Sequence, residues 1–255
     1  MIILPKITRR RALIGSLGLT GLALAGCDKI AGSDSVTRVL SAGEAFTRTS
    51  QRLVLGKNAP LAREYKASDI SPNFKANGTV EPDTDVYKQA QEDDFANWRL
   101  GVFGLVTKPL SLSLAELKRL PARTQITRHD CVEGWSAIGG WTGVPLGLLL
   151  QAAGMQPTAR YAVFHCADLY DGDPYYESID LIDAFHPQTL LAYAMNGSPL
   201  TVAHGAPLRL RLERQLGYKQ AKYVMGVELV ANFSRFGKGK GGYWEDNGYE
   251  WYAGI

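Results

Sequence analysis

The sequence predicts an α+β protein that is rich in strands and has short helices. Segments of strand composition recur through the second half of the chain between turn residues, while the helical patterns are short and begin at capping residues. The sequence shows no internal repeat. Its composition, 45% hydrophobic and 21% charged, is that of an ordinary globular domain and excludes a disordered or collagen-like chain.

Helices are predicted where a capping or proline signal precedes an apolar pattern. Ser followed three residues later by Glu opens two of them, because each side chain can bond the backbone N–H of the other residue. A third is predicted to begin at Pro145, a residue type favoured at the first helical position, and to end at Gly154. In chain order, the predicted helices span residues 41–54, 113–121, 146–153 and 178–185.

Strands are predicted where β-branched and aromatic residues lie between turn residues. They span residues 98–106, 124–128, 161–166, 190–195, 207–212 and 222–230. Asn196-Gly197 is a strong hairpin signal. Gly139, Gly140 and Gly143 indicate that the backbone approaches another group closely. Residues 61–91 have little periodicity and predict a long loop, which in a compact domain usually carries function.

The positive charge of the chain is concentrated at its N-terminus. The chain has 28 Lys and Arg against 25 Asp and Glu, a formal charge of +3 that by itself would suggest a nucleic-acid or anionic-membrane partner. Residues 1–26 contain four of these cations and no acid, so the remaining chain has 24 cations against 25 acids. We therefore expect no nucleic-acid partner.

Residues 1–26 predict an export signal. A basic segment precedes an apolar stretch at residues 12–26, which is shorter than the roughly 20 residues needed to cross a bilayer. Arg9-Arg10-Arg11 resembles a twin-arginine export motif, and residues 24–27 (LAGC) resemble a bacterial lipobox. An ordinary N-terminal anchor, or a chance run of arginines, is the alternative.

These motifs predict a division of the chain into three parts. Residues 1–26 form the signal peptide, residues 27–36 a polar tether, and residues 37–255 one domain. Cys27 is expected to carry the lipid. Asp28 beside it indicates retention at the inner membrane, so we expect a lipid-anchored periplasmic protein.

Cys131 carries the most suggestive chemistry in the chain, and three interpretations compete. In an oxidising compartment, Cys131 and Cys166 could pair as a disulfide in a non-catalytic lipoprotein. Assisted by His129, His165 or His204, Cys131 could be the nucleophile of a hydrolase. A thiolate also suits a soft or high-valent metal. The residue chemistry alone leaves all three open.

Five sequence blocks resemble the sulfite oxidase family of molybdopterin-dependent oxidoreductases. They are residues 131–136 (CVEGWS), 141–146 (WTGVPL), 191–200 (LAYAMNGSPL), 204–209 (HGAPLR) and 217–222 (GYKQAK). They follow the family's order within residues 72–230. The resemblance implies a sulfite-oxidase-type molybdopterin-binding fold and one Mo-molybdopterin per chain. We expect no C-terminal dimerisation domain before Ile255, and hence a monomer.

The resemblance also implies a role for individual residues. Cys131 matches the thiolate ligand of the metal, and Tyr249 matches the active-site tyrosine. Arg209 and Lys222 suit the cofactor phosphate, as a bidentate donor and a point charge respectively. The implied cofactor-binding positions are Phe74, Lys75, Ala76, Asn77, Cys166, Asp168, His204, Arg209, Gln220, Ala221 and Lys222.

Two positions depart from the true sulfite oxidases. Ala76 stands where they have an arginine that holds sulfite, and Gly248 stands where they have an aspartate. Because loss of the arginine removes a strong anion donor, sulfite is not expected to be the physiological substrate. The resemblance extends to the periplasmic reductases of protein methionine sulfoxide, which implies oxygen-atom transfer on an S-oxide or sulfite-like substrate.

Two further features bear on the electron partner and on the pocket. The sequence contains no C-x-x-C-H haem motif, so electrons are expected to be exchanged with a separate cytochrome or quinone-linked membrane protein. Residues 242–252 contain five aromatic residues. This tail is expected either to cover the cofactor mouth or to complete the core.

Overall fold

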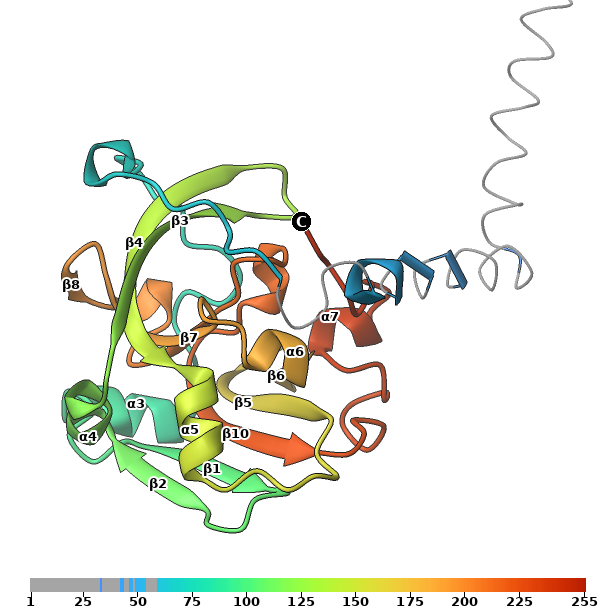
Figure 1. The fold of residues 1–255 in the computed structure, drawn as a ribbon. Coiled ribbons are helices and arrows are strands. Elements are labelled where there is room, and N and C mark those ends of the chain that lie inside the picture. The colour runs from blue at the N-terminus through green and yellow to red at the C-terminus, as the bar shows by residue number, and fades with distance from the viewer. Residues whose placement is uncertain (1–32, 34–41, 44–45, 48, 54–58) are drawn as a thin grey trace, which may run out of the picture. The chain divides into compact units, whose positions relative to one another are not determined.

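The computed structural model describes Ser33 and residues 42–43, 46–47, 49–53 and 59–255 (Figure 1). The chain divides into two compact units, Met1–Val54 and Leu55–Ile255. In the first unit, the described residues other than Ser33 are helical, as the capping box at residues 41–44 predicts. The predicted signal peptide and the tether, including Cys27 but not Ser33, lie outside the described residues. Within the described part, no helix is long and apolar enough to cross a membrane.

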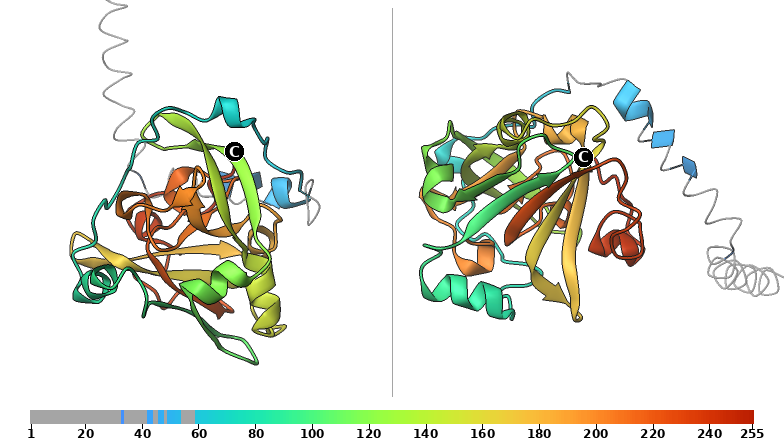
Figure 2. Two further views of the ribbon diagram at one scale, coloured as in Figure 1. Left: turned by 90° about the vertical axis from the view of Figure 1, so that its left-hand side faces the viewer. Right: turned by 90° about the horizontal axis from the view of Figure 1, so that it is seen from below.

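Strands dominate the second unit. They are β1 (Arg99–Gly104), β2 (Leu110–Ser113), β3 (Arg123–Asp130), β4 (Ser136–Pro145), β5 (Tyr161–Tyr170), β6 (Asp173–Asp180), β7 (Leu190–Met195), β8 (Ser198–Pro199), β9 (Arg209–Arg211) and β10 (Val224–Val230). One sheet has the order β2-β1-β10-β5-β6, and β10 lies between β1 and β5 (Figure 2). The other has the order β3-β4-β7-β8, with β9 also paired to β7.

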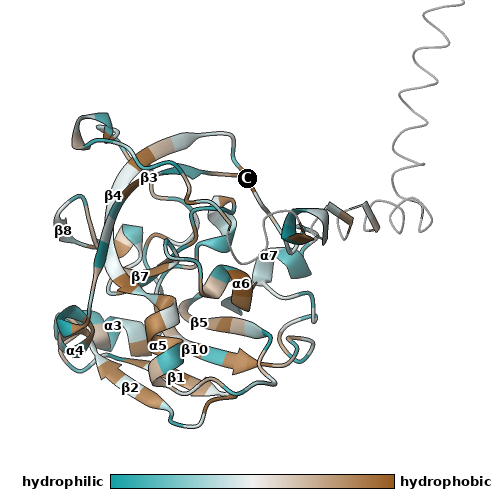
Figure 3. Ribbon diagram, viewed as in Figure 1, coloured by the Kyte–Doolittle hydropathy of each residue, from teal (hydrophilic) through white to brown (hydrophobic). Residues whose placement is uncertain are grey.

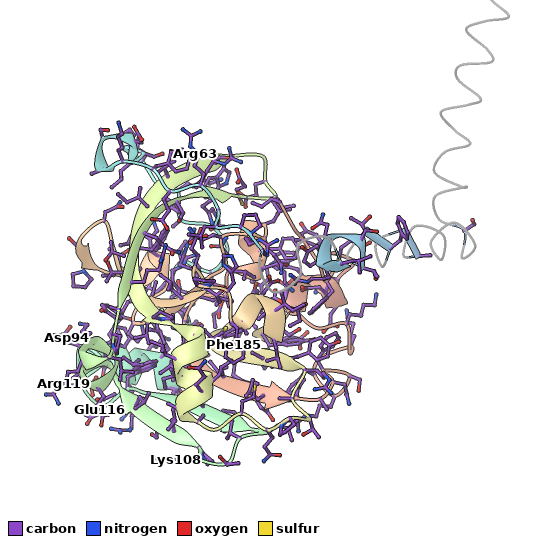
Figure 4. All side chains as sticks on the ribbon, viewed as in Figure 1. Arg63, Asp94, Lys108, Glu116, Arg119 and Phe185 are labelled. Carbon is purple, nitrogen blue, oxygen red and sulfur yellow. The ribbon has the colours of Figure 1, made fainter. Side chains whose placement is uncertain are left out.

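Short helices connect the strands. They are α3 (Asp85–Glu92), α4 (Leu114–Arg119), α5 (Leu146–Ala152), α6 (Leu181–Ala184) and α7 (Tyr243–Asp246), with 3-10 turns η2 (Ala67–Asp69), η3 (Val202–His204) and η4 (Gly217–Lys219). In α4, Ser113 Oγ accepts from Glu116 N while Glu116 Oε2 accepts from Ser113 N, so the predicted capping box is confirmed. Figure 4 shows Glu116 and Arg119 on this helix. The predicted strand-rich α+β fold with short helices is also confirmed.

The main hydrophobic core joins the two sheets. Leu100 of β1 and Val227 of β10 are fully buried in the same cluster as Val144 of β4 and Leu149 of α5. Figure 3 shows apolar residues recurring along β1, β10 and α5. Helix α5 packs against Phe185 (Figure 4), so closely that a Cβ at Gly147 would lie 2.9 Å from that ring. The core therefore fixes the sheet edges from which the site residues project.

The sequence-based prediction missed strand β4. Its glycines had indicated close approach of the backbone to another group, and that group is largely the neighbouring strand. A Cβ at Gly143 would lie 2.2 Å from Leu191 O of β7, and one at Gly139 would lie 3.2 Å from the Phe74 ring. Because glycine has a low strand propensity, the sequence did not predict β4. Gly143 is nevertheless required, since the neighbouring strand leaves no room for a Cβ.

Other elements also differ from the prediction, and β2 and α7 were not predicted. Residues 61–91 are not all loop, because α3 begins at Asp85. This short helix is mostly polar, and Tyr87 is its only buried residue, so the sequence contains little sign of it. The predicted helix at residues 178–185 is a strand through Asp180 and a helix only afterwards. There Asp180 accepts a hydrogen bond from Asp183 N as the N-cap, so the capping signal lies later than predicted.

Candidate functional site

A cleft in the second unit collects residues from several distant segments. Its volume, including the open mouth, is about 740 Å³. The predicted site residues that line it are Asn77, Cys131, Asp168, Arg209, Gln220, Lys222 and Tyr249. The other lining residues are Gly78, Thr79, Val132, Glu133, Tyr170, Tyr175, Gly217, Tyr218 and Trp244. Half of the predicted positions are thus brought together by strand ends and loops.

Cys131 reaches the cleft through a tight turn at the end of β3. Cys131 N donates to Trp135 O at 2.9 Å and Gly134 N donates to Cys131 O at 3.0 Å. Gly134 has a φ of +87°, a conformation that favours glycine. The turn leaves Cys131 only 6% exposed, with its Sγ 3.5 Å from the Asn77 amide nitrogen. The thiol therefore lies at the cleft with one amide donor beside it.

The environment of Cys131 does not activate it as a free nucleophile. Burial raises the pKa of its thiol above the ordinary value, whereas a nucleophilic cysteine needs a lowered pKa. Each candidate base is engaged elsewhere: His129 Nδ1 accepts from Arg211, His165 pairs with Glu228, and His204 binds Phe74 O. A bound metal would instead hold this sulfur as the thiolate.

The two core cysteines do not form a disulfide. Cys131 and Cys166 are both free thiols. Cys166 lines a second cavity, among residues such as His165 and Phe236, whereas Cys131 lines the first. The disulfide interpretation is therefore not what the structure contains, and Cys166 lies away from the cleft to which the resemblance had assigned it.

Arg209 and Lys222 give the cleft two buried positive charges. Burial and the charge of Arg211 lower the pKa of Arg209 to about 9, and burial and the charge of Arg209 lower that of Lys222 to about 7. Arg209 Nε has no hydrogen-bond partner among the described residues. Lys222 Nζ donates to the carbonyls of Asn77, Thr79 and Ala203, so it also ties the 77–79 loop to the cleft.

A buried layer supports these cations. The ring of Trp141 lies 4.1 Å from the Arg211 guanidinium and 4.9 Å from that of Arg209. Arg211 is paired with Glu213 at 2.7 Å and donates to His129 Nδ1 at 3.1 Å. Because a guanidinium only donates, Nε2 of the neutral His129 ring carries the proton. Burial and the Arg211 charge keep the pKa of His129 well below its ordinary value.

Aromatic side chains form the wall of the cleft. Trp244 stacks on Tyr249 with ring centroids 5.2 Å apart, and Tyr249 meets Tyr218 edge-on at 5.1 Å. Tyr243 and Tyr252, from the same tail, are buried. The tail therefore does both things that the sequence left open, since Trp244 and Tyr249 line the cleft while their neighbours complete the core.

Several predicted positions do not line the cleft. They are Phe74, Lys75, Ala76, Cys166, His204 and Ala221. Phe74 and His204 act one layer behind it: Phe74 O accepts from His204 Nε2 at 3.0 Å, and His204 O accepts from Arg209 at 3.0 Å. Lys75 is exposed and pairs with Glu133 at 2.9 Å.

Sequence reasoning missed part of the site. Glu133 lies in the CVEGWS block and was available from that match, and Trp244 lies in the aromatic tail. Thr79, Tyr170 and Tyr175 had no local signal, because only the fold brings them to the cleft. The supporting pair of Trp141 and Arg211 was hidden for the same reason.

Comparison with known proteins identifies the family. Residues 87–235 match the model of the oxidoreductase molybdopterin binding domain. The chain belongs to this family.

Similar proteins carry related names. The chain is 40% identical over 247 residues to the putative protein-methionine-sulfoxide reductase subunit YedZ1 of Azospira oryzae, covering 96% of this chain and 87% of that protein. It is 34% identical to the protein-methionine-sulfoxide reductase catalytic subunit MsrP of Xanthomonas campestris pv. campestris, covering 87% of this chain and 70% of that protein. The crystal structure of sulfane dehydrogenase SoxCD from Paracoccus pantotrophus aligns with a TM-score of 0.49 at 25% identity, covering 54% of this chain and 39% of that one.

The residues of the cleft fit the cofactor of a molybdopterin-binding oxidoreductase. Arg209 is buried with an unpartnered Nε, and its charge and that of Lys222 are not matched by a paired carboxylate in the described residues. Such cations require an anion, which the phosphate of a pterin cofactor supplies. Asp168 Oδ1 is also buried without a partner and can accept from a pterin N–H. Cys131 offers the soft sulfur donor in the same cleft.

Proposed function

We propose that this protein is a periplasmic molybdenum enzyme that reduces sulfoxides, with methionine sulfoxide in proteins as the substrate class. The observation that carries the proposal is the single cleft that joins the Cys131 thiol to the unmatched cations Arg209 and Lys222. The names of the relatives, protein-methionine-sulfoxide reductase subunits, support the direction of the reaction. The net change is a sulfoxide plus two electrons and two protons giving a sulfide and water.

The residues of the cleft have distinct parts in this reaction. When bound, the molybdenum cofactor supplies oxygen-atom transfer and two-electron chemistry. Arg209 would hold its phosphate, and Lys222, whose ammonium donates to three backbone carbonyls, would add positive charge beside it. Cys131 would bind the metal, with the Asn77 amide donating to the sulfur at 3.5 Å. Together these residues would orient the cofactor in the cleft.

The mouth of the cleft favours a neutral thioether S-oxide over sulfite. Trp244 and Tyr249 present aromatic surface, against which a methionine sulfur packs favourably. Glu133 contributes a carboxylate whose pKa is lowered by its hydrogen bonds from Lys75 and Trp135, and its pairing with Lys75 leaves that lysine without a free charge for sulfite. Ala76 supplies no cation and does not line the cleft. Tyr249, which lines the cleft, would donate a hydrogen bond to the S–O group.

The proposal includes a location and an electron partner. The leader motifs support export and a lipid on Cys27 at the inner membrane. Both relatives are named as subunits, which supports a separate membrane protein, haem- or quinone-linked, that supplies electrons. Fractionation of cells expressing wild type and Cys27→Ala tests the anchor. We expect the protein to move from the membrane to the soluble periplasmic fraction in the variant, and an unchanged distribution contradicts the lipid.

One experiment tests the activity. Protein purified from molybdate-supplied cells should contain about one molybdenum per chain, as one cofactor per domain requires. With a reduced viologen as electron donor, it should reduce a peptide that contains methionine sulfoxide. Folded protein without molybdenum, or sulfite oxidation faster than sulfoxide reduction, would overturn the proposal.

A further inference from the structure

A buried ion cluster lies behind the aromatic wall of the cleft. Lys219 Nζ donates to Glu177 Oε1 at 2.5 Å, to Ser178 O at 3.0 Å and to Glu245 Oε1. The side chains of Lys219 and Glu177 are 0% exposed and that of Glu245 is 1% exposed. These three residues come from three different elements, η4, β6 and α7, and none of them lines the cleft.

The cluster contains two carboxyl groups for one ammonium group. Glu177 Oε2 and Glu245 Oε2 are buried and have no hydrogen-bond partner among the described residues. Burial and the charge of Glu245 raise the pKa of Glu177 well above its ordinary value. Two buried carboxyl groups that face a single ammonium group therefore favour the protonated form of Glu177.

The chain is shaped closely around this cluster. A Cβ at Gly242 would lie 2.1 Å from Glu245 Oε2 and 2.8 Å from Glu177 Oε1, so no larger residue fits there without displacing a carboxyl group. The Lys219 ammonium also lies 5.3 Å from the ring of Trp251. The Trp251 indole N–H donates to Ser178 Oγ at 2.9 Å, which attaches the end of the tail to β6.

Two members of the cluster, Lys219 and Glu245, are adjacent in sequence to residues that line the cleft. Lys219 lies between Tyr218 and Gln220, and Glu245 follows Trp244. The ammonium therefore holds the cofactor-facing loop, and the carboxyl group of Glu245 holds the helix that presents the aromatic wall. A buried ion cluster contributes little net stability compared with apolar packing, so its distinctive effect is geometric.

We propose that Lys219 is a positioning residue, which fixes the distance between the loop at residues 217–220 and the aromatic wall of Trp244 and Tyr249 by binding Glu177 and Glu245. The cleft width follows from this distance, because Tyr249 meets both Trp244 and Tyr218. The identity of the substrate rests on the proposed function, but the positioning does not.

The test separates geometry from stability with a neutral variant. Lys219→Met alone leaves two buried carboxyl groups without a cation and is expected to fold poorly. The triple variant Lys219→Met, Glu177→Gln, Glu245→Gln removes all three charges at similar volume and is expected to fold. Lys238→Met is the matched control, since this exposed lysine binds Asn247 of the same tail segment at 3.1 Å.

Hydrogen–deuterium exchange of residues 242–252 is the first measurement, because it needs no activity. The triple variant should exchange there about tenfold faster than wild type, as a locally opened segment does, with no change in β5 and β10. The control should exchange as wild type does. Wild-type exchange in the triple variant overturns the proposal, whether or not the protein reduces sulfoxides.

Steady-state kinetics give the second measurement. With rates expressed per bound molybdenum, the triple variant should show a KM for the sulfoxide peptide about tenfold higher, in the range seen for loss of supporting contacts, and a smaller change in kcat. A lower kcat at unchanged KM contradicts a role in setting the substrate wall. If wild type does not reduce sulfoxides but the triple variant still exchanges faster at residues 242–252, the positioning is supported and the proposed function is refuted.

Discussion

One buried charge cluster lines the cleft and a second lies behind its aromatic wall, and the two are unbalanced in opposite directions. Arg209 and Lys222 carry positive charge without a paired carboxylate, and the pKa of each is lowered by burial and by the neighbouring cation. Glu177 and Glu245 share the single ammonium of Lys219, and burial raises the pKa of Glu177. Among the described residues, no carboxylate forms a salt bridge with Arg209 or Lys222, although Asp168 lies in the same cleft. The second cluster has two carboxyl groups for one ammonium group.

The difference lies in what can reach each cluster. Arg209 and Lys222 line the cleft, so an anionic ligand can complete them. The Lys219 cluster is sealed from the cleft, and only a proton can balance it. An imbalance that faces a cavity indicates a ligand, whereas a sealed imbalance indicates a structural device.

Substitution of Cys131, the proposed metal ligand in the cleft, should have the largest effect on activity. Cys131→Ser should reduce sulfoxide turnover by more than the roughly 100-fold that loss of an outer contact to a metal site costs, since it removes the ligand itself. The measurement is turnover with reduced viologen, together with circular dichroism to show that the variant is folded. A folded variant with more than a tenth of wild-type activity would contradict the assignment.

The same type of substitution should have opposite effects in the two clusters. In cofactor-free protein, Lys219→Met leaves two buried carboxyl groups without a cation and should lower the free energy of unfolding by about 3–5 kcal/mol. Arg209→Met removes an unmatched buried cation and should leave that free energy unchanged or raise it. Urea unfolding of the two apoproteins measures both. Equal destabilisation by the two substitutions would refute the distinction.

The molybdenum content of the purified protein further tests the role of Arg209. Arg209→Met should be purified with much less molybdenum than wild type, because it loses a charged donor to the phosphate. Lys238→Met, a surface substitution, should retain the wild-type metal content. Full occupancy in Arg209→Met would remove the argument that the open cluster binds the cofactor.

A steric clash next to the cluster of Arg209 and Lys222 should have a smaller effect on stability. A Cβ at Gly217 would lie 2.5 Å from the ring of His129, which is fixed by its bond from Arg211. Gly217→Ala should therefore destabilise the protein by about 1–3 kcal/mol through overpacking. Gly172→Ala offers a comparison, since nothing lies within 4 Å of its added Cβ, although its φ of +87° adds backbone strain. A smaller loss at Gly217 than at Gly172 would contradict the steric explanation.

The pH dependence of the apoprotein gives the smallest effect. Lys222 has a pKa of about 7 in the folded chain and an ordinary value of 10.5, so above pH 7 the unfolded chain binds the proton that the folded chain lacks. The free energy of unfolding should then rise with pH between about 7 and 8.5, by at most about 1.4 kcal/mol per unit. Urea unfolding across this window measures the slope.

Lys222→Met should abolish that rise, while Lys238→Met should keep it. Bound cofactor should also suppress the rise, because an anion restores the charge on Lys222. An identical slope in wild type and Lys222→Met would show that another group titrates in this window.

The sequence by itself determined the features that depend on adjacent residues. The Ser113–Glu116 box caps α4 as predicted. The Asn196-Gly197 turn, with φ values of 51° and 80°, joins β7 to β8 as the hairpin signal predicts. The motif blocks identified the family. The turn that brings Cys131 to the cleft is closed by hydrogen bonds within residues 131–135. In each case, the interacting groups are close along the chain.

Only the tertiary structure decided which distant residues meet. Strand β4 depends on β7 for the room that its glycines provide, and Cys166 faces a second cavity because β5 orients it there. Lys219 finds Glu177 at a separation of 42 residues. Local patterns carry no information on such pairs, since burial and the neighbouring charges arise only when the sheets pack. The family could be recognised from the sequence, but the balance of charge around its cleft required the fold.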